Sequence, residues 1–187
     1  MTTPAASREH VDAILAAYRA SSSLERELGA SWYGDARETA HRLAAEYGAT
    51  LDTAAGIIAA LSPRQTWSGN VRAAETLLAA YALGLELPAV GLRRNAAKAW
   101  RIAAGEDPDA VLSGPKVRSF FRNILGDPDA VTVDTWAARV AGETRATFTP
   151  AQYGRLAAAY RAAAAALGLA PAIVQATTWI HVRGAAD

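Results

Sequence analysis

The sequence predicts an all-α protein, and two observations support this fold class. Apolar residues recur at helical spacing in one segment after another, and no segment shows the sustained alternation of a strand. Hydrophobic residues make up 51% of the 187 residues, and alanine, which favours helix, supplies much of that fraction. Because alanine buries little surface, the larger Leu, Ile, Val and aromatic residues must anchor the core of one large or two small helical domains.

The first half of the chain predicts four helices. They are expected over residues 8–20, 34–47, 50–61 and 67–83. In the first of them, Val11, Ile14 and Tyr18 share one face at the i, i+3 and i+7 spacing of an amphipathic helix. The second ends at Gly48. The third is apolar nearly all round and stops before Pro63, because proline disfavours helical geometry in the residue that precedes it.

The second half predicts four short helices and then two longer ones. They are expected over residues 93–104, 107–112, 115–125, 134–141, 150–167 and 171–182, with residues 131–133 as an apolar bridge. Pro115, Pro150 and Pro171 lie near helix starts, where the missing N–H costs nothing. Ser113 is the expected N-cap of the helix over 115–125, and Gly126 closes that helix.

The composition excludes several classes of site. The chain has no cysteine, which rules out disulfides, thiolate catalysis, cysteine-ligated zinc and iron–sulfur clusters. Its three histidines are scattered, without HxxxH or HExxH spacing, so we expect no metal and no cofactor. No apolar stretch reaches about 18 residues, and no signal pattern opens the chain, so we expect a soluble cytoplasmic protein with no membrane partner.

The net charge of +1 conceals an asymmetry between the two parts of the chain. Residues 1–60 have a net charge of −3, and residues 61–187 have a net charge of +4. Within the second part, residues 91–101 contain four basic side chains and no acid. This bias suits a polyanionic partner, whereas the plainer interpretation is a set of solvated helix faces.

Lys116 and Asp134 each have a structural and a catalytic interpretation. Lys116 falls in the first turn of a helix, where the positive end of the helix dipole disfavours an ammonium group, as a nucleophilic lysine requires. It could equally be a solvated lysine or a contact to phosphate. Asp134 opens the next helix, where aspartate is a common N-cap, and a carboxylate held in that way could also stabilise positive charge developing on a sugar.

Residues 61–70, LSPRQTWSGN, form a polar and aromatic turn between two buried helices. Planar Gln and Trp side chains suit the filling of a gap in a base stack, or stacking on a base. The alternative is an ordinary interhelix turn anchored by Trp67. Near the C-terminus, His181 and Trp179 could line a pocket, and an interior histidine with satisfied hydrogen bonds is the alternative there.

Three blocks in this order resemble the helix-hairpin-helix DNA glycosylase superfamily, and endonuclease III shows the most similar pattern. Residues 60–76, ALSPRQTWSGNVRAAET, resemble its LSxQxTD turn, and residues 91–102, GLRRNAAKAWRI, resemble its GLYxxKAxxI segment. Residues 112–140 resemble its LPGVGxKTAxxV…xVDTH hairpin and catalytic segment, with LSGPK in place of LPGVGxK. Asp134 follows Lys116 by 18 residues, as in bifunctional members, whereas a match without gaps would place Arg118 on the lysine.

The resemblance implies a base-flipping enzyme that acts on double-stranded DNA as a monomer. Asp134 would stabilise an oxocarbenium-like sugar, and Lys116 would form a Schiff base that allows strand cleavage. Gln65, or Arg64 without a shift, would fill the vacated stack. The remaining implied DNA contacts are Asn70, Lys98, Ser113, Gly114 and Arg118, and the implied base pocket contains Trp67, Trp136 and His181.

The implied architecture is a single helix-hairpin-helix glycosylase-like unit over residues 1–187, a helical bundle of two lobes with a cleft between them. Residues 55–142 would form the lobe with the hairpin, and residues 1–54 and 143–187 would pack as the second lobe. The Ala- and Arg-rich chain also resembles proteins of phages with actinobacterial hosts, where it would act in the host cytoplasm. Two further functions stay open: transfer of a group onto a modified pyrimidine such as 5-hydroxymethyluracil, and a non-catalytic DNA-binding module.

Overall fold

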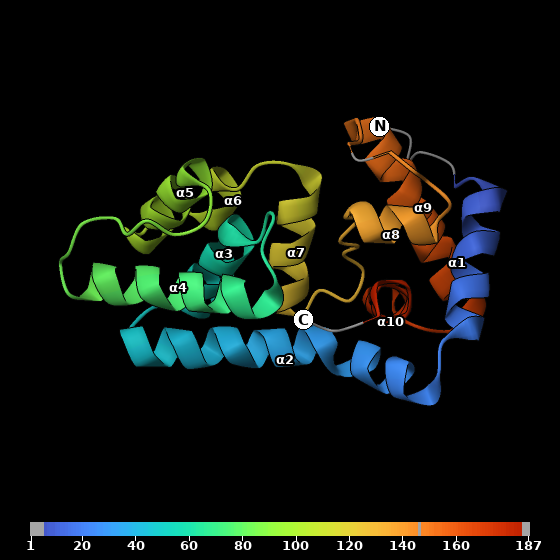
Figure 1. Ribbon diagram of the computed structural model, residues 1–187, viewed down its shortest axis with the longest axis horizontal. Coiled ribbons are helices and arrows are strands. Elements are labelled where there is room, and N and C mark those ends of the chain that lie inside the picture. Colours follow the sequence, from blue (N-terminus) through green and yellow to red (C-terminus); the bar gives the residue numbers. More distant parts are fainter. Residues whose placement is uncertain (1–5, 146, 185–187) are drawn as a thin grey trace. The chain divides into compact units, whose positions relative to one another are not determined.

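The computed structural model describes residues 6–145 and 147–184, and the described residues form ten helices and no strand (Figure 1). The predicted all-α class is therefore confirmed. In chain order the helices are α1 (Arg8–Ala20), α2 (Ser23–Tyr47), α3 (Leu51–Leu61), α4 (Trp67–Ala82), α5 (Arg93–Ala103), α6 (Pro108–Val111), α7 (Pro115–Leu125), α8 (Thr135–Val140), α9 (Pro150–Leu167) and α10 (Pro171–Arg183).

The helices belong to two compact units, and α2 passes from one to the other. The central unit comprises residues 34–125, and the terminal unit comprises the described residues of 1–33 and 126–186. The predicted hairpin lobe, 55–142, includes α8, whereas the contacts of α8 are with α10 and α1 in the terminal unit. The reason is physical, because the apolar residues before and within α8 join the same core as α1, α9 and α10.

In the central unit, α3 is the buried helix against which α4, α5 and α7 pack (Figure 1). Every residue from Ala54 to Leu61 is buried, as the apolar run predicts. Thr50 begins the helix as its N-cap, accepting the N–H of Thr53 at 3.1 Å. A Cβ at Gly56 would lie 2.9 Å from Pro108 of α6. The absence of a side chain at Gly56 therefore lets α3 approach α6.

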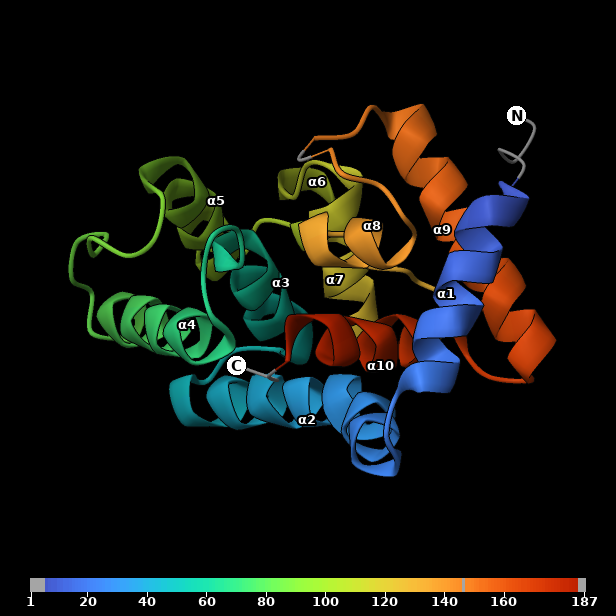
Figure 2. The same cartoon turned by 45° about the vertical axis from the view of Figure 1, so that its right-hand side comes forward.

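In the terminal unit, α1, α8, α9 and α10 enclose the second core (Figure 2). Its largest fully buried side chains include Ile14 from α1 and Tyr160 from α9. The bridge before α8 contributes Val131 and Val133, and α10 contributes Val174. A buried bridge of this kind fixes where α8 begins, and therefore where Asp134 lies within this unit.

Helix α2 begins at Ser23, eleven residues earlier than the helix predicted over 34–47. The prediction missed a capping box at its start. The Oγ of Ser22 accepts the N–H of Glu25 at 3.2 Å, and the N–H of Ser22 donates to Oε2 of Glu25 at 2.6 Å. Gly29 and Gly34 weaken the helical signal of this segment in the sequence, whereas packing in the folded chain offsets their low propensity.

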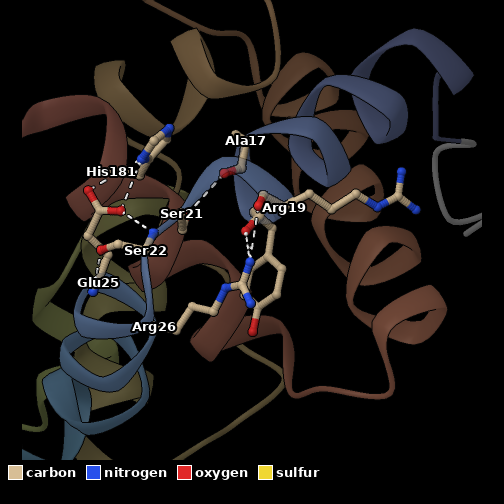
Figure 3. A network of polar contacts seen from close by, with 8 residues as sticks. Ala17, Arg19, Ser21, Ser22, Glu25, Arg26 and His181 are labelled. Atoms are coloured by element: carbon tan, nitrogen blue, oxygen red, sulfur yellow. Dashed lines mark hydrogen bonds and ion pairs between the residues drawn. The ribbon is translucent and has the colours of Figure 1, made fainter.

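Polar contacts hold the corner between α1 and α2 (Figure 3). The hydroxyl of Ser21 donates to the carbonyl of Ala17 at 3.0 Å, and Nη2 of Arg26 lies 3.1 Å from the carbonyl of Arg19. From α10, Nδ1 of His181 lies 3.2 Å from Oε2 of Glu25. Hydrogen bonds from Ser22 and the contact with His181 lower the pKa of Glu25. The start of α2 is thus tied to the C-terminal helix.

Within the described residues, no single helix is both long and apolar enough to cross a membrane. Helices α9 and α10 meet the length and composition test only when taken together, across a bend of 102°.

Candidate functional site

Asp134 is the N-cap of α8, and each of its carboxylate oxygens accepts a hydrogen bond. Oδ1 accepts the backbone N–H of Ala137 at 2.8 Å, which is the predicted cap contact. Oδ2 accepts the indole Nε1–H of Trp179, from α10, at 2.9 Å. The side chain is partly buried. Two donors in fixed positions hold this carboxylate in one orientation, while part of it stays accessible to solvent.

Two buried tyrosines of α9 fix the backbone on either side of Asp134. The hydroxyl of Tyr153 donates to the carbonyl of Val131 at 2.7 Å and accepts the N–H of Val133 at 3.1 Å. The hydroxyl of Tyr160 donates to the carbonyl of Ala137 at 2.8 Å. The two tyrosines are seven residues apart and so lie on one face of α9. The two tyrosines were not predicted as site residues from the sequence, although their spacing marks that face.

The indole of Trp179, which contacts Asp134, belongs to an aromatic cluster with Trp32 and Tyr33. The ring centroids of Trp32 and Trp179 lie 6.2 Å apart, and the guanidinium of Arg183 lies 4.6 Å from the centroid of the Trp179 ring. The hydroxyl of Tyr33 donates to Oε1 of the buried Gln175 at 2.6 Å. Trp32 and Arg183 therefore pack against the indole that donates to Asp134.

Burial raises the pKa of the hydroxyls of Tyr33 and Tyr160, and the negative charge of Asp134 raises both further. Both phenols therefore stay protonated at neutral pH and act as hydrogen-bond donors. Asp134 is thus close enough to influence two neutral phenols, of which Tyr33 donates to Gln175 and Tyr160 donates to the carbonyl of Ala137.

The turn before α7, residues 112–114, is the segment predicted to form the hairpin. Gly114 adopts a left-handed φ of 84°, and its carbonyl accepts the N–H of Arg118 at 3.2 Å, so Gly114 is the N-cap. The prediction that Ser113 caps α7 is therefore wrong, because the Ser113 hydroxyl instead contacts the ammonium of Lys98. Nε of Arg118 donates to the carbonyl of Leu112 at 2.9 Å and so closes the turn.

Lys116 is the second residue of α7 and is partly buried. It belongs to the central unit, whereas Asp134 belongs to the terminal unit. The chain contains only one other lysine, Lys98 of α5.

The turn between α3 and α4 contains the only non-glycine residue with a positive φ in the described part of the chain, Arg64 at 66°. Such a backbone is uncommon for arginine and frequently occurs at functional turns. The next residue, Gln65, is partly buried. Its Nε2 lies 3.3 Å from the ideal Cβ position of Gly91, and its Oε1 lies 3.2 Å from that of Gly69. In this structure, therefore, the Gln65 amide lies against the unit, while Arg64 is exposed.

Asn70 does not lie on an accessible surface, so its predicted DNA contact is corrected. It is 2% exposed, and its Nδ2 donates to the carbonyl of Ile58 at 3.0 Å, which links α4 to α3. A buried amide needs such a partner, and the last turns of α3 supply one. Trp67, at the start of the same helix, lies edge-on to Phe120 with the ring centroids 6.5 Å apart.

The other two residues of the predicted base pocket lie in the terminal unit. Trp136 is partly buried in α8, with the guanidinium of Arg139 at 4.6 Å from its ring centroid. His181 is also partly buried, and its Nδ1 contacts the carboxylate of Glu25. Trp67 belongs to the central unit, so the structure brings only Trp136 and His181 into one unit.

An open pocket of about 220 Å³ lies in the central unit between the start of α5 and the predicted hairpin, residues 112–114. Its polar lining comes from Arg94, Asn95, Lys98 and Ser113. Two predicted DNA contacts, Lys98 and Ser113, therefore meet at one site. Across the described residues, no group of three or more His, Cys, Asp or Glu side chains could hold a metal ion.

Fold and site together define an all-α protein with a fixed carboxylate in one unit and a basic pocket in the other. The chain belongs to DUF7178, a family of unknown function, whose model matches residues 1–186. No curated protein and no solved structure matches the chain.

Proposed function

We propose that this protein binds double-stranded DNA and removes a damaged or modified base, with Asp134 as the catalytic carboxylate. The observation that supports this best is the fixed position of Asp134, whose oxygens accept the N–H groups of Ala137 and Trp179 at 2.8 and 2.9 Å. A carboxylate with this geometry needs little reorganisation when positive charge develops beside it.

The chemistry is the breaking of an N-glycosidic bond. The C1′–N bond breaks and the base leaves with the bonding electron pair, so positive charge accumulates on C1′ and the ring oxygen of the sugar. Asp134 stabilises that charge and takes a proton from the water that adds its oxygen to C1′. The leaving base takes up a proton from solvent, which balances the reaction.

The basic surface supports a DNA partner. Arg94, Lys98 and Arg118 form no ion pair with a carboxylate of the described residues. By contrast, Arg101 pairs with Glu106 at 2.5 Å and Arg122 pairs with Asp109 at 2.8 Å. Cations without a neighbouring acid are available to bind phosphate groups, and contacts of this kind provide most of the affinity of proteins for DNA.

The geometry of α6, the turn and α7 supports the finer part of the proposal, a helix-hairpin-helix glycosylase-like fold. Gly114 is exposed, has a left-handed φ and precedes α7, and the N-terminus of a helix suits a backbone phosphate.

Lys116 is proposed separately as the amine of a lyase step. In the abasic product the amine would add to the C1′ aldehyde of the ring-opened sugar, and the resulting carbinolamine would lose water to form a Schiff base that permits elimination of the 3′ phosphate. Arg118, the other match to the family's lysine, cannot serve because a guanidinium stays protonated.

Mass spectrometry of released bases tests the proposal. The protein is incubated with duplexes that each contain one lesion or one modified base, including uracil and 5-hydroxymethyluracil. We expect release from at least one duplex and its loss in Asp134→Asn, with retention in Asp12→Asn, an exposed carboxylate of α1. Retained DNA binding without base release from any duplex would contradict the proposal. A gain of mass on the nucleoside would indicate group transfer instead.

Borohydride trapping tests the lyase step with an internal control, because Lys98 and Lys116 are the only lysines of the chain. With the protein in excess, so that weaker DNA binding by Lys98→Ala does not limit the yield, the covalent adduct with DNA should persist in Lys98→Ala and disappear in Lys116→Ala. The converse pattern would show that the assignment of the amine is wrong.

A further inference from the structure

The pocket between α5 and the predicted hairpin has the features of an anion site, and none of these features involves Asp134. Two helices of eleven residues, α5 and α7, begin at its edge. Leu92, the N-cap of α5, and Val117, in the first turn of α7, both line it. No side chain caps the start of α5. Helix starts direct backbone N–H groups and a partial positive charge toward an anion, and here two of them meet at one pocket.

The side chains around the pocket are basic and lack an acidic neighbour. Arg94 and Lys98 line it together with seven other residues, none of them Asp or Glu. The ammonium of Lys98 contacts the hydroxyl of Ser113, a neutral group that orients the lysine and leaves its charge unopposed. The pocket therefore has two positive charges with no carboxylate in its lining.

Asn95 is an independent indication of a ligand. It lines the pocket and is 8% exposed, so more than nine-tenths of it is buried. Its side chain forms no hydrogen bond within the described part of the chain, whereas its backbone N–H donates to Leu92 at 2.7 Å. An amide that lines a pocket without a hydrogen bond inside the chain is available to a polar group of a ligand.

The size of the pocket limits the occupant. At about 220 Å³ it lies below the roughly 300–1,000 Å³ of pockets that enclose drug-sized ligands. Its remaining surface is apolar, from Ala60, Pro63, Leu92, Leu112 and Val117. A small anion with a short apolar attachment matches both the charge and the volume.

We propose that this pocket binds the phosphate group of a phosphate monoester in its dianionic form. The two cations match its two charges, and the Asn95 amide, the Ser113 hydroxyl and the helix-start amides supply donors for its three terminal oxygens. A phosphodiester has one charge and two such oxygens, and it matches the site less well. The monoester could be the phosphorylated end of a DNA strand or a free mononucleotide. This proposal does not rest on base removal.

Titration of the full chain with methyl phosphate and with dimethyl phosphate tests the choice between monoester and diester. The measurement is made by amide NMR at about pH 7.5, where a monoester with a second pKa near 6 is dianionic. We expect saturable shifts of the amides of Asn95, Ser113 and Val117. Methyl phosphate should bind at least about tenfold more tightly than dimethyl phosphate, because it has one more negative charge and one more terminal oxygen. Equal affinities, or no saturable shift, would overturn the proposal.

Two variants and one control locate the site. Lys98→Ala and Ser113→Asp should each weaken methyl phosphate binding at least about tenfold, a loss on the scale of one charge-assisted hydrogen bond. Ser113 is exposed, so its variant should fold even where Lys98→Ala does not. Arg101→Ala, on the same helix but paired with Glu106, should leave the affinity unchanged. An equal loss in Arg101→Ala would overturn the pocket assignment.

Two further ligands identify the source of the monoester. A duplex with 5′-phosphorylated ends is compared with the same duplex without them, and thymidine 5′-monophosphate is titrated separately. Tighter binding of the phosphorylated duplex, lost in Ser113→Asp, indicates a strand end. Pocket shifts with the mononucleotide alone indicate a free nucleotide, and either result supports a monoester site. Failure of both ligands to shift the pocket amides would refute it, whatever the outcome of the base-release assay.

Discussion

Gly29 of α2 permits a close approach to α10, and its replacement by alanine tests how the terminal unit is packed. An ideal Cβ at Gly29 would lie 2.2 Å from Oγ1 of Thr177 and 2.6 and 2.7 Å from its Cα and N. Two of these three atoms belong to the backbone, so a rotamer change cannot relieve the overlap. Helix α10 would have to move, and Trp179 with it.

Two effects of opposite sign determine the magnitude. Overpacking in a buried contact costs typically 1–3 kcal/mol, and backbone overlap places Gly29→Ala toward the upper part of that range. Replacing glycine by alanine inside a helix contributes up to about 1 kcal/mol in the other direction. We therefore expect a net loss of about 1–2 kcal/mol in the free energy of unfolding.

Gly34 supplies the matched control in the same helix. A Cβ at Gly34 would meet nothing within 4 Å. Gly34→Ala should therefore stabilise the protein by about 0.5–1 kcal/mol through helix propensity alone. The two variants differ only in the space around the new methyl group, so the opposite signs isolate the packing effect.

Urea denaturation followed by tryptophan fluorescence and by circular dichroism measures both variants. At this chain length, 1 kcal/mol corresponds to a change of about 2–4 °C in Tm, so thermal melts should also separate the two. If Gly29→Ala is as stable as Gly34→Ala, the close contact between α2 and α10 is wrong, and so is the placement of Trp179 that depends on it.

Three further predictions concern Asp134, a helix cap and a pH-sensitive contact. Asp134→Asn should reduce base release by at least about 10²-fold in single-turnover assays. The amide oxygen can accept the N–H of Ala137, but the amide NH2 would face the indole N–H of Trp179, so Tm should also fall. An undiminished rate of base release would exclude the carboxylate from catalysis. Thr66→Ala should lower the free energy of unfolding, measured by urea denaturation, by about 1 kcal/mol, because the Thr66 hydroxyl accepts the N–H of Gly69 at 3.1 Å. Ser7→Ala should change it little, because the Ser7 side chain makes no cap hydrogen bond. Equal effects of the two variants would contradict this prediction. Because the folded state lowers the pKa of Glu25, this group stabilises the fold at pH values above its ordinary pKa of 4.5, and the stabilisation is lost as pH falls through the folded-state pKa. Glu25→Gln should therefore make the free energy of unfolding depend less steeply on pH in the acid range. An unchanged dependence would refute the linkage.

Helix positions could be predicted largely from the sequence, because their signals are local. Pro150, Pro171 and the apolar period of α1 mark helices whose observed bounds agree with the prediction to within one residue. The first eleven residues of α2 were missed, since their helix depends on the capping box of Ser22 and Glu25 and on packing against α10. Local propensity cannot register a contact with a segment about 150 residues away along the chain.

The candidate site was less predictable than the helices. Asp134 was identified as a cap, and the cap contact with Ala137 is confirmed. Its second partner, Trp179, is 45 residues away in the sequence, so the hydrogen bond between them exists only in the folded unit. Asn70 shows the opposite error, because a polar residue in a turn-rich segment was expected at the surface and is instead a buried link between α3 and α4.

The sequence by itself determined the all-α class, the order of the helices, the absence of cysteine chemistry and the basic bias after residue 60. These properties depend on composition and on contacts within one or two helical turns. Only the tertiary structure decided that the start of α5 and the hairpin share a pocket with Asn95 buried in its wall, and that Trp179 donates to Asp134. Both arrangements arise because burial of apolar faces brings distant segments together, and the polar side chains between those faces must then find partners in the folded chain.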